Sequence, residues 1–280
     1  MSHSKARTLR ETLREASMRV PETEARHLLR WALDVSDTWM FLHADAPMPD
    51  AGAQKFASAI ERRQRGEPVA YIEGRRGFWT LDLEVSPATL IPRVETERLV
   101  EAALAVLPEN SALEVLDLGT GSGAIALALA TERPMAHVIG VDLSEAALAV
   151  AERNRLRYAA DNAEFIQSAW YAQLGARKFH CIVSNPPYIP EGDAHLAQGD
   201  LRFEPRSALS SGDDGLDDIR LIVTGATSRL HPGGALLIEH GFDQATSVRT
   251  LLETAGFERV ETLQDLESRD RVSLGFQRGA

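Results

Sequence analysis

The stretch Leu116-Asp117-Leu118-Gly119-Thr120-Gly121-Ser122-Gly123 decides the fold of this chain. An apolar run ends in alternating glycines, and a helix-forming run follows at residues 124–131. A strand, a glycine turn and a helix in this order are typical of a parallel α/β sheet, with the turn facing a ligand at the carboxyl end of the strand. Glycine permits positive φ and close backbone approach to that ligand. We therefore expect Gly119, Thr120, Gly121, Ser122 and Gly123 to bind a cofactor.

Strands and helices alternate on both sides of this turn, as in a parallel sheet. Strands are predicted at residues 113–118, 137–141, 163–167, 179–184 and 235–239, and helices at 95–107, 124–131, 144–158 and 216–230. Strands at 259–266 and 271–277 are predicted to pair antiparallel at the sheet edge. The pattern predicts an α/β domain over residues 94–280, built on a Rossmann-like sheet of seven strands.

The first part of the chain has a different pattern, which predicts a small helical domain over residues 1–75. Apolar residues recur at helical spacing in residues 4–18 and 22–33, and a third helix is predicted at 51–64. Residues 78–85 alternate between apolar and polar, and Ser86-Pro87 follows. Residues 76–93 are therefore expected to form a linker containing a β-hairpin.

Two residues beyond the glycine turn are predicted to complete the cofactor site. Asp142 ends the second strand about 20 residues further on, where a carboxylate binds a ribose diol. Trp170 follows the third strand, where its ring can border an adenine. The turn alone leaves the ligand open, because Gly119-x-Gly121-x-x-Ala124 also fits a dinucleotide pattern. Asp117 favours S-adenosylmethionine, because its negative charge opposes a pyrophosphate and suits a cationic ligand.

The tetrapeptide Asn185-Pro186-Pro187-Tyr188, after the strand at 179–184, carries the predicted chemistry. Its prolines fix φ and remove two backbone donors, which leaves carbonyls that can only accept. The Asn185 side-chain oxygen and the Pro186 carbonyl can bind the two N–H groups of a planar amine or amide, with Tyr188 packed on it. We predict Asn185, Pro186 and Tyr188 to be catalytic, and these three with Pro187 to bind the substrate. The long loop at 191–215 has the length of a lid or binding loop.

Composition limits the alternatives. The only cysteine, Cys181, cannot form an internal disulfide or a cysteine-rich metal site, and no metal is expected. Residues 1–14 are polar and the apolar run at 124–130 is too short to cross a membrane, so we expect a cytoplasmic protein. The net charge is −11, and residues 76–280 carry 18 basic and 30 acidic groups, which disfavours stable nucleic-acid binding.

The chain resembles the bacterial peptide-chain release factor glutamine methyltransferases along essentially its whole length. The resemblance rests on residues 90–97, 116–130, 183–189 and 198–205, of which the first and last are the most particular to that family. It implies a class I methyltransferase fold and a methyl donor, S-adenosylmethionine, bound by Gly119 to Gly123, Asp142, Trp170 and Asn185. It also implies methylation of the glutamine amide nitrogen N5 in the Gly-Gly-Gln motif of class 1 release factors, with Asn185 to Tyr188 forming the glutamine pocket.

Two residues depart from the family pattern. Val94 stands where proline is usual, which loosens the linker, and Ala169 stands where an acid is common, so that a hydrogen bond to the adenine is missing. The release factor is expected to dock on both domains, with a monomeric enzyme and no membrane contact. Arg93 with Glu95 and Glu97 is predicted to form an interdomain ion-pair cluster or to touch the substrate.

Two other functions remain open from the sequence. An N6-adenine methyltransferase acting on DNA or RNA needs the same tetrapeptide, together with basic groups and a pocket for a flipped base. A non-catalytic S-adenosylmethionine-binding protein would not require Asn185 and Tyr188. The acidic second domain disfavours the first alternative, and the intact tetrapeptide disfavours the second.

Overall fold

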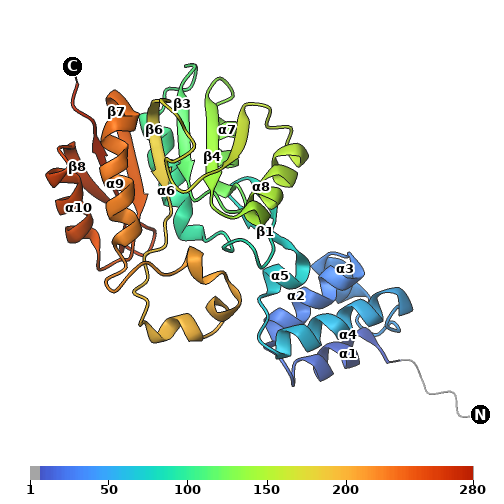
Figure 1. Cartoon of the computed structure of the whole chain (residues 1–280). Coiled ribbons are helices and arrows are strands. Elements are labelled where there is room, and N and C mark those ends of the chain that lie inside the picture. Colours follow the sequence, from blue (N-terminus) through green and yellow to red (C-terminus); the bar gives the residue numbers. More distant parts are fainter. Residues whose placement is uncertain (1–6, 280) are drawn as a thin grey trace, which may run out of the picture. The chain divides into compact units, whose positions relative to one another are not determined.

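The computed structural model describes residues 7–279 of the chain (Figure 1). The chain divides after Gly74 into two compact units. The first unit is helical and contains α1 (Leu9–Ala16), α2 (Glu22–Leu33), α3 (Asp37–Leu42), α4 (Asp50–Gln64) and α5 (Val69–Glu73). Helices α2 and α4 pack together around the buried side chains Leu28, Leu29, Phe56 and Ile60.

Local capping explains where the helices of this unit differ from prediction. The predicted helix at 4–18 shortens to α1 because Thr8 accepts a hydrogen bond from Glu11 N and Glu11 reciprocates, which fixes the helix start. Residues 4–6 of that prediction lie outside the described residues. Helix α3 was not predicted; it begins where Ser36 caps Trp39 N, and it is too short to show a helical period.

The second unit begins with a hairpin of β1 (Arg75–Phe78) and β2 (Leu81–Glu84). A seven-stranded sheet follows, in the order β5-β4-β3-β6-β7-β9-β8. Its strands are β3 (Glu114–Leu118), β4 (His137–Asp142), β5 (Ala163–Gln167), β6 (Phe179–Ser184), β7 (Leu230–Glu239), β8 (Glu258–Gln264) and β9 (Asp270–Phe276). Strands β3 to β7 are parallel, while β9 runs antiparallel to both β7 and β8. The α/β fold and the antiparallel pair at the edge are confirmed.

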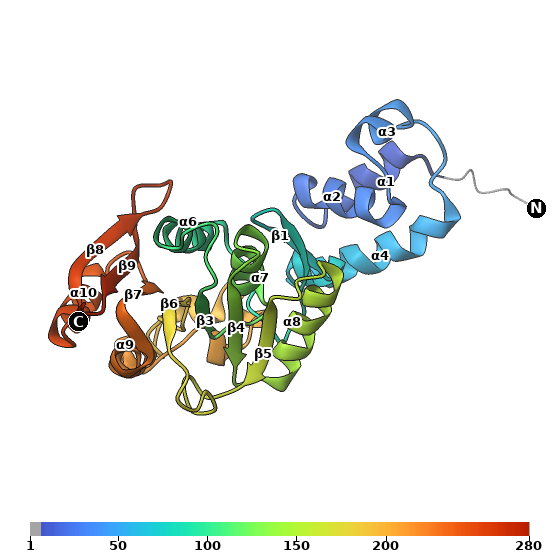
Figure 2. The same cartoon turned by 90° about the horizontal axis from the view of Figure 1, so that it is seen from above.

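Helices cover both faces of the sheet (Figure 2). On one face lie α6 (Glu97–Val106), α7 (Ala124–Glu132) and α8 (Glu145–Arg157); on the other lie α9 (Asp217–Arg229) and α10 (Ala245–Thr254), of which α10 was not predicted. Alternate residues of each strand supply the two cores; Val115, for example, faces α7 and Leu116 faces α9. Helix α7 is buried along almost its whole length, which explains its apolar sequence. Within residues 7–279, no helix has both the length and the apolarity needed to traverse a bilayer.

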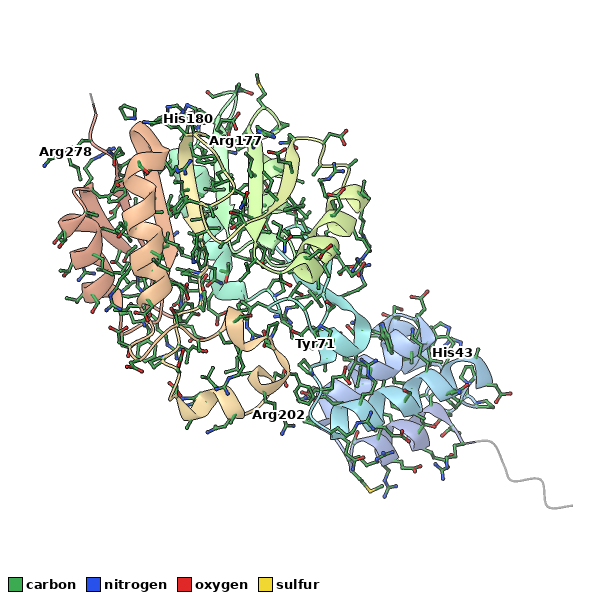
Figure 3. All side chains as sticks on the ribbon, in the orientation of Figure 1. His43, Tyr71, Arg177, His180, Arg202 and Arg278 are labelled. Atoms are coloured by element: carbon green, nitrogen blue, oxygen red, sulfur yellow. The ribbon has the colours of Figure 1, made fainter. Side chains whose placement is uncertain are left out.

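The strand order creates a ligand site between β3 and β6. From β3 the chain proceeds to β4 on one side, and β6 later pairs with β3 on the other side, so the order reverses at this point. Ligands of open α/β sheets bind outside the carboxyl ends of the strands at such a point. Leu118 pairs with Ser184, so the glycine turn and Asn185 emerge side by side. Figure 3 shows Arg177 and His180 at the amino end of β6 and Arg202 in the loop beyond its carboxyl end.

Candidate active site

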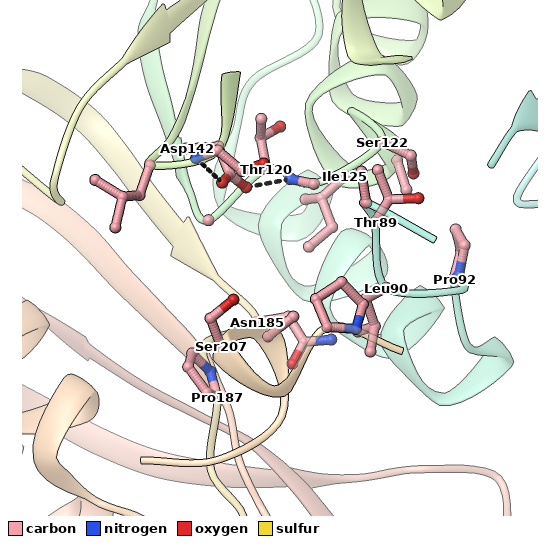
Figure 4. Close-up of a pocket in the computed structure, with 18 of the residues that line it drawn as sticks. Thr89, Leu90, Pro92, Thr120, Ser122, Ile125, Asp142, Asn185, Pro187 and Ser207 are labelled. Carbon is pink, nitrogen blue, oxygen red and sulfur yellow. Dashed lines mark hydrogen bonds between the residues drawn. The ribbon is translucent and has the colours of Figure 1, made fainter. Parts of the chain in front are cut away.

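The carboxyl ends of β3, β4 and β6 open onto a cavity of about 660 Å³ (Figure 4). Linker residues 87–96 and loop residues 205–210 contribute further walls. Most of the predicted site residues line this cavity: Gly119, Thr120, Gly121, Ser122, Asp142, Trp170, Asn185 and Pro187. Gly123, Pro186 and Tyr188 are not part of the lining.

The glycines of the turn have two different functions. Gly121 has φ +55°, and a Cβ built on it would meet no atom within 4 Å, so its bare Cα leaves room for a ligand. Gly123 has φ +82°, and a Cβ there would lie 2.9 Å from Cζ of Phe165. Gly123 is thus required for packing of α7 against β5, which explains why it does not line the cavity.

Asp117 stabilises the glycine turn from the protein interior. It is fully buried, and its Oδ2 accepts hydrogen bonds from the Thr120 hydroxyl at 2.7 Å and from Ala126 N at 3.2 Å. Burial raises the pKa of Asp117 to about 7, against these two hydrogen bonds. Asp117 therefore supports the turn without lining the cavity itself.

The carboxylate of Asp142 lies in the cavity wall with its oxygens already oriented (Figure 4). Oδ2 accepts from Gly121 N and Oδ1 accepts from Ser144 N, both at 2.9 Å. Each carboxylate oxygen can accept a second hydrogen bond, so both can still bind a diol. These acceptors, the bare Cα of Gly121 and the apolar side chains of Leu90 and Ile125 suit S-adenosylmethionine.

Trp170 borders the cavity from the turn after β5. Its φ is +49°, and the edge of its ring would lie 3.5 Å from a Cβ on Gly119. This conformation costs a non-glycine residue about 1–3 kcal/mol, so it persists only where the surrounding structure fixes it. The neighbouring Ala169 is exposed and also lines the cavity, where it presents only a methyl group.

The Asn-Pro-Pro-Tyr tetrapeptide directly follows the end of β6. Asn185 lines the cavity, and its Nδ2 donates a hydrogen bond to Oγ1 of Thr96 at 3.1 Å. Tyr188 points away from the cavity wall and packs against the α9 side of the core. Its hydroxyl lies 3.4 Å from Oε1 of Glu239, and burial, followed by the charge of Glu239, raises the pKa of Tyr188.

A buried carboxylate joins the linker to the loop after the tetrapeptide, an arrangement we call the linker–loop clasp (Ile91, Arg93 and Glu204). Glu204 forms an ion pair with Arg93, and its Oε2 accepts from Ile91 N at 3.0 Å. Burial raises the pKa of Glu204, and Arg93 opposes that shift. The predicted cluster of Arg93 with Glu95 and Glu97 was wrong: Glu97 accepts from Trp79 N at 2.8 Å, and Arg93 pairs with Glu204.

Three residues near the cavity were not singled out from the sequence as site residues: Thr96, Glu204 and Glu239. Glu204 lies in the stretch 198–205 that carries the family resemblance, so its position was a usable signal. Thr96 lies in the stretch 90–97 and had the same signal, although a threonine before a helix normally indicates a cap. Glu239 had no such signal. Across residues 7–279, histidine, cysteine and acidic side chains form no group of three or more that could hold a metal ion.

Comparison with known proteins identifies both units. Residues 6–74 match the model of the PrmC N-terminal domain, and residues 98–203 match that of the methyltransferase small domain. A solved methyltransferase from Pyrococcus furiosus superposes with a TM-score of 0.54 at 19% identity, covering 80% of this chain and 100% of that chain. Fold and family models together define an S-adenosylmethionine-dependent methyltransferase.

Sequence relatives narrow this class. The release factor glutamine methyltransferase of Xylella fastidiosa (strain Temecula1) is 54% identical over 263 residues, which cover 94% of this chain and 96% of the relative. The enzyme of the same name from Pseudomonas aeruginosa is 56% identical over 228 residues, 81% and 82% of the two chains. This chain belongs to the release factor glutamine methyltransferase family, and the predicted resemblance is confirmed.

Proposed function

We propose that this protein transfers the methyl group of S-adenosylmethionine to the side-chain amide N5 of the glutamine in the Gly-Gly-Gln motif of class 1 release factors. One observation carries the proposal: the Asn185 amide and the glycine turn line a single cavity, at the ends of the adjacent strands β3 and β6. A group bound by Asn185 therefore lies beside a ligand bound at Gly121 and Asp142.

The glutamine nitrogen needs activation because amide resonance delocalises its lone pair, with a rotation barrier of about 18–20 kcal/mol in peptides. Asn185 Oδ1 and the Pro186 carbonyl accept the two N–H groups and orient the nitrogen toward the methyl group. Bound S-adenosylmethionine supplies an electrophilic methyl on a sulfonium. Alignment of this kind contributes about 7–11 kcal/mol. The proton then leaves the methylated nitrogen readily, so the site needs no strong base.

The other tetrapeptide residues have supporting roles in this proposal. Pro187 forms the cavity wall beside the glutamine. Pro186 is not among the residues that line the cavity, and only its backbone carbonyl is proposed to accept from the glutamine amide. Tyr188, which we predicted to pack on the amide, holds the turn against the core through its ring and through Glu239. Gly119, Thr120, Gly121, Ser122, Asp142, Trp170 and Asn185 bind the donor, while Gly123, which we predicted to bind it, serves packing instead.

Residues 1–75 dock the release factor in this proposal. The cavity accommodates one side chain, whereas a protein substrate needs a larger surface. Phe41 and Leu42, at the end of α3, are 78% and 71% exposed, and they form an apolar surface suited to a protein partner. The proposal also assigns the protein to the cytoplasm as a monomer without stable nucleic-acid binding, consistent with the net charge of −11.

Labelled S-adenosylmethionine tests the function directly. The protein is incubated with a class 1 release factor, with the same factor carrying alanine in place of the motif glutamine, and with duplex DNA. Mass spectrometry is expected to locate one methyl group on the motif glutamine and none on the variant or the DNA. Label on DNA alone would instead support the adenine methyltransferase, and label elsewhere on the factor would contradict the proposed substrate.

A further inference from the structure

The side chain that orients the substrate must itself be oriented. An asparagine amide offers a carbonyl on one side and an NH2 group on the other, and the two ends have nearly the same shape. Only Oδ1 of Asn185 can accept from a substrate –NH2 group, since two NH2 groups facing each other cannot bond. The structure must therefore fix which end of Asn185 faces the cavity.

Thr96 provides the first contact that fixes it. Asn185 Nδ2 donates to Thr96 Oγ1 at 3.1 Å. Thr96 is 4% exposed and precedes helix α6, yet its hydroxyl caps no backbone N–H of that helix. A threonine at this position usually caps the helix, so its hydroxyl here serves another contact.

Glu239 provides the second contact. It ends β7, and the pairing of Ser184 with Ile238 places it next to Asn185 across the sheet. Its side chain is buried, and its Oε2 has no hydrogen-bond partner among the described residues. Burial raises the pKa of Glu239, the Thr96 hydroxyl, Arg271 and Tyr188 lower it, and Glu95 raises it further.

The direction of the hydroxyl proton follows from these contacts. A threonine hydroxyl has one proton and two lone pairs. When the proton points to the Glu239 carboxylate, Oγ1 can only accept from Asn185. The amide must then present Nδ2 to Thr96 and Oδ1 to the cavity. A Thr96 hydroxyl free to rotate could donate to Oδ1 instead, which would favour the flipped amide.

We propose that Thr96 and Glu239 are positioning residues that hold the Asn185 amide with its oxygen toward the substrate. They would make the site selective for an acceptor that donates N–H groups, such as the glutamine carboxamide. This inference rests on the proposed function for its substrate, but not for the orientation of Asn185.

Threonine-to-valine replacement removes the hydroxyl at nearly constant shape. In Thr96→Val, kcat for release factor methylation should fall about 10-fold or more, short of the about 100-fold expected when a direct transition-state contact is lost. Donor affinity, measured by calorimetry, should be unchanged, and Thr96→Ser should restore most of kcat. Ser273→Ala is the matched control, because it removes another fully buried hydroxyl, bonded to His240 and Thr262, and should leave kcat unchanged.

The pH profile tests Glu239. Its pKa is raised to about 7, chiefly by burial, and the carboxylate form is the one that accepts from Thr96. Wild-type kcat should therefore rise with pH through about 7, and this limb should be absent in Glu239→Gln. The other groups facing Glu239, namely Tyr188, Glu95 and Arg271, remain in that variant.

A readout without substrate separates this inference from the proposed function. In ¹⁵N-labelled protein, the Asn185 side-chain NH2 protons should exchange with water at least about 10-fold more slowly in the wild type than in Thr96→Val, because the donated bond protects them. If the wild-type protein fails to methylate the release factor, the proposed function is refuted. The exchange rates would still test whether Thr96 and Glu239 orient Asn185. If Thr96→Val keeps the kcat of the wild type and its Asn185 protons exchange at the wild-type rate, the proposed orientation of Asn185 by Thr96 and Glu239 is overturned. The proposal is also overturned if Thr96→Val loses donor binding and stability and Thr96→Ser does not restore them.

Discussion

Replacing Glu204 with glutamine tests whether the linker–loop clasp closes the active-site cavity. Glutamine keeps the shape of the side chain and can still accept from Ile91 N, so the change removes only the charged pairing with Arg93. The Arg93 side chain is 34% exposed and can be hydrated after the change. The loss should therefore equal the net value of one charge-assisted hydrogen bond, about 1.5–3 kcal/mol.

This energy sets how often the clasp opens. A loss of 1.5–3 kcal/mol raises the population of the open loop about 10- to 150-fold. Hydrogen exchange of peptides from residues 191–215 should accelerate by that factor, while peptides from α7 remain protected. The donor KM should rise as well, because Arg93 and Pro205 both line the cavity.

Two further variants make this prediction specific. Arg93→Met should open the loop more than Glu204→Gln, because it leaves a fully buried carboxylate unpaired, at a cost of about 3–5 kcal/mol. Arg220→Ala is the control: it removes an exposed ion pair with Asp214 in the same loop region, 2.5 Å between Nη2 and Oδ2, worth at most about 1 kcal/mol. Unchanged exchange in Glu204→Gln, or an equal acceleration in Arg220→Ala, would refute the reasoning.

Three other changes are expected to separate binding, chemistry and stability. Asn185→Ala should retain most of the donor affinity by calorimetry, because the other donor contacts remain, but lower kcat at least about 100-fold; near-normal turnover would contradict its role. Gly123→Ala should lower the free energy of unfolding in urea by about 1–3 kcal/mol, because φ is +82° and its Cβ would approach Phe165 to 2.9 Å; wild-type stability would show that Phe165 yields freely. Asp117 has a pKa raised from 3.8 to about 7, so the folded state binds the extra proton and stability falls as pH rises across that window, by at most about 4 kcal/mol. Asp117→Asn should remove this share of the pH dependence in urea titrations, and an unchanged slope would show that Asp117 does not cause it.

The sequence was sufficient to predict the sheet because its signals are local. The glycine turn, Asp142 and the apolar strands lie within short segments, and parallel neighbours end at the same edge of a sheet. That edge brings Gly121 and Asn185 into one cavity without any knowledge of side-chain contacts. The predicted positions of the five parallel strands therefore also predicted where the cavity lies.

Contacts between distant segments could not be predicted in the same way. Arg93 lies two positions from Glu95 in sequence but pairs with Glu204, which is 111 residues away. Tyr188 follows two prolines of the predicted pocket, yet its ring packs against the core on the α9 side of the sheet. Sequence spacing carries no information about such directions once a chain leaves regular structure.

The two halves of the cavity differ in how they are built, and this difference predicts how mutations will act. The glycine turn and Asp142 form one continuous β3–α7–β4 unit, held together by Asp117 and by the hydrogen bond from Gly121 N to Asp142. The acceptor half is assembled from the linker, the tetrapeptide, the end of β7 and the distal loop, joined only by tertiary contacts such as the clasp and Thr96. Changes in the first half should therefore act mainly on donor affinity. Changes in the second should act mainly on transfer to the release factor, with an added rise in donor KM where they open the clasp, and they include positions that touch neither ligand.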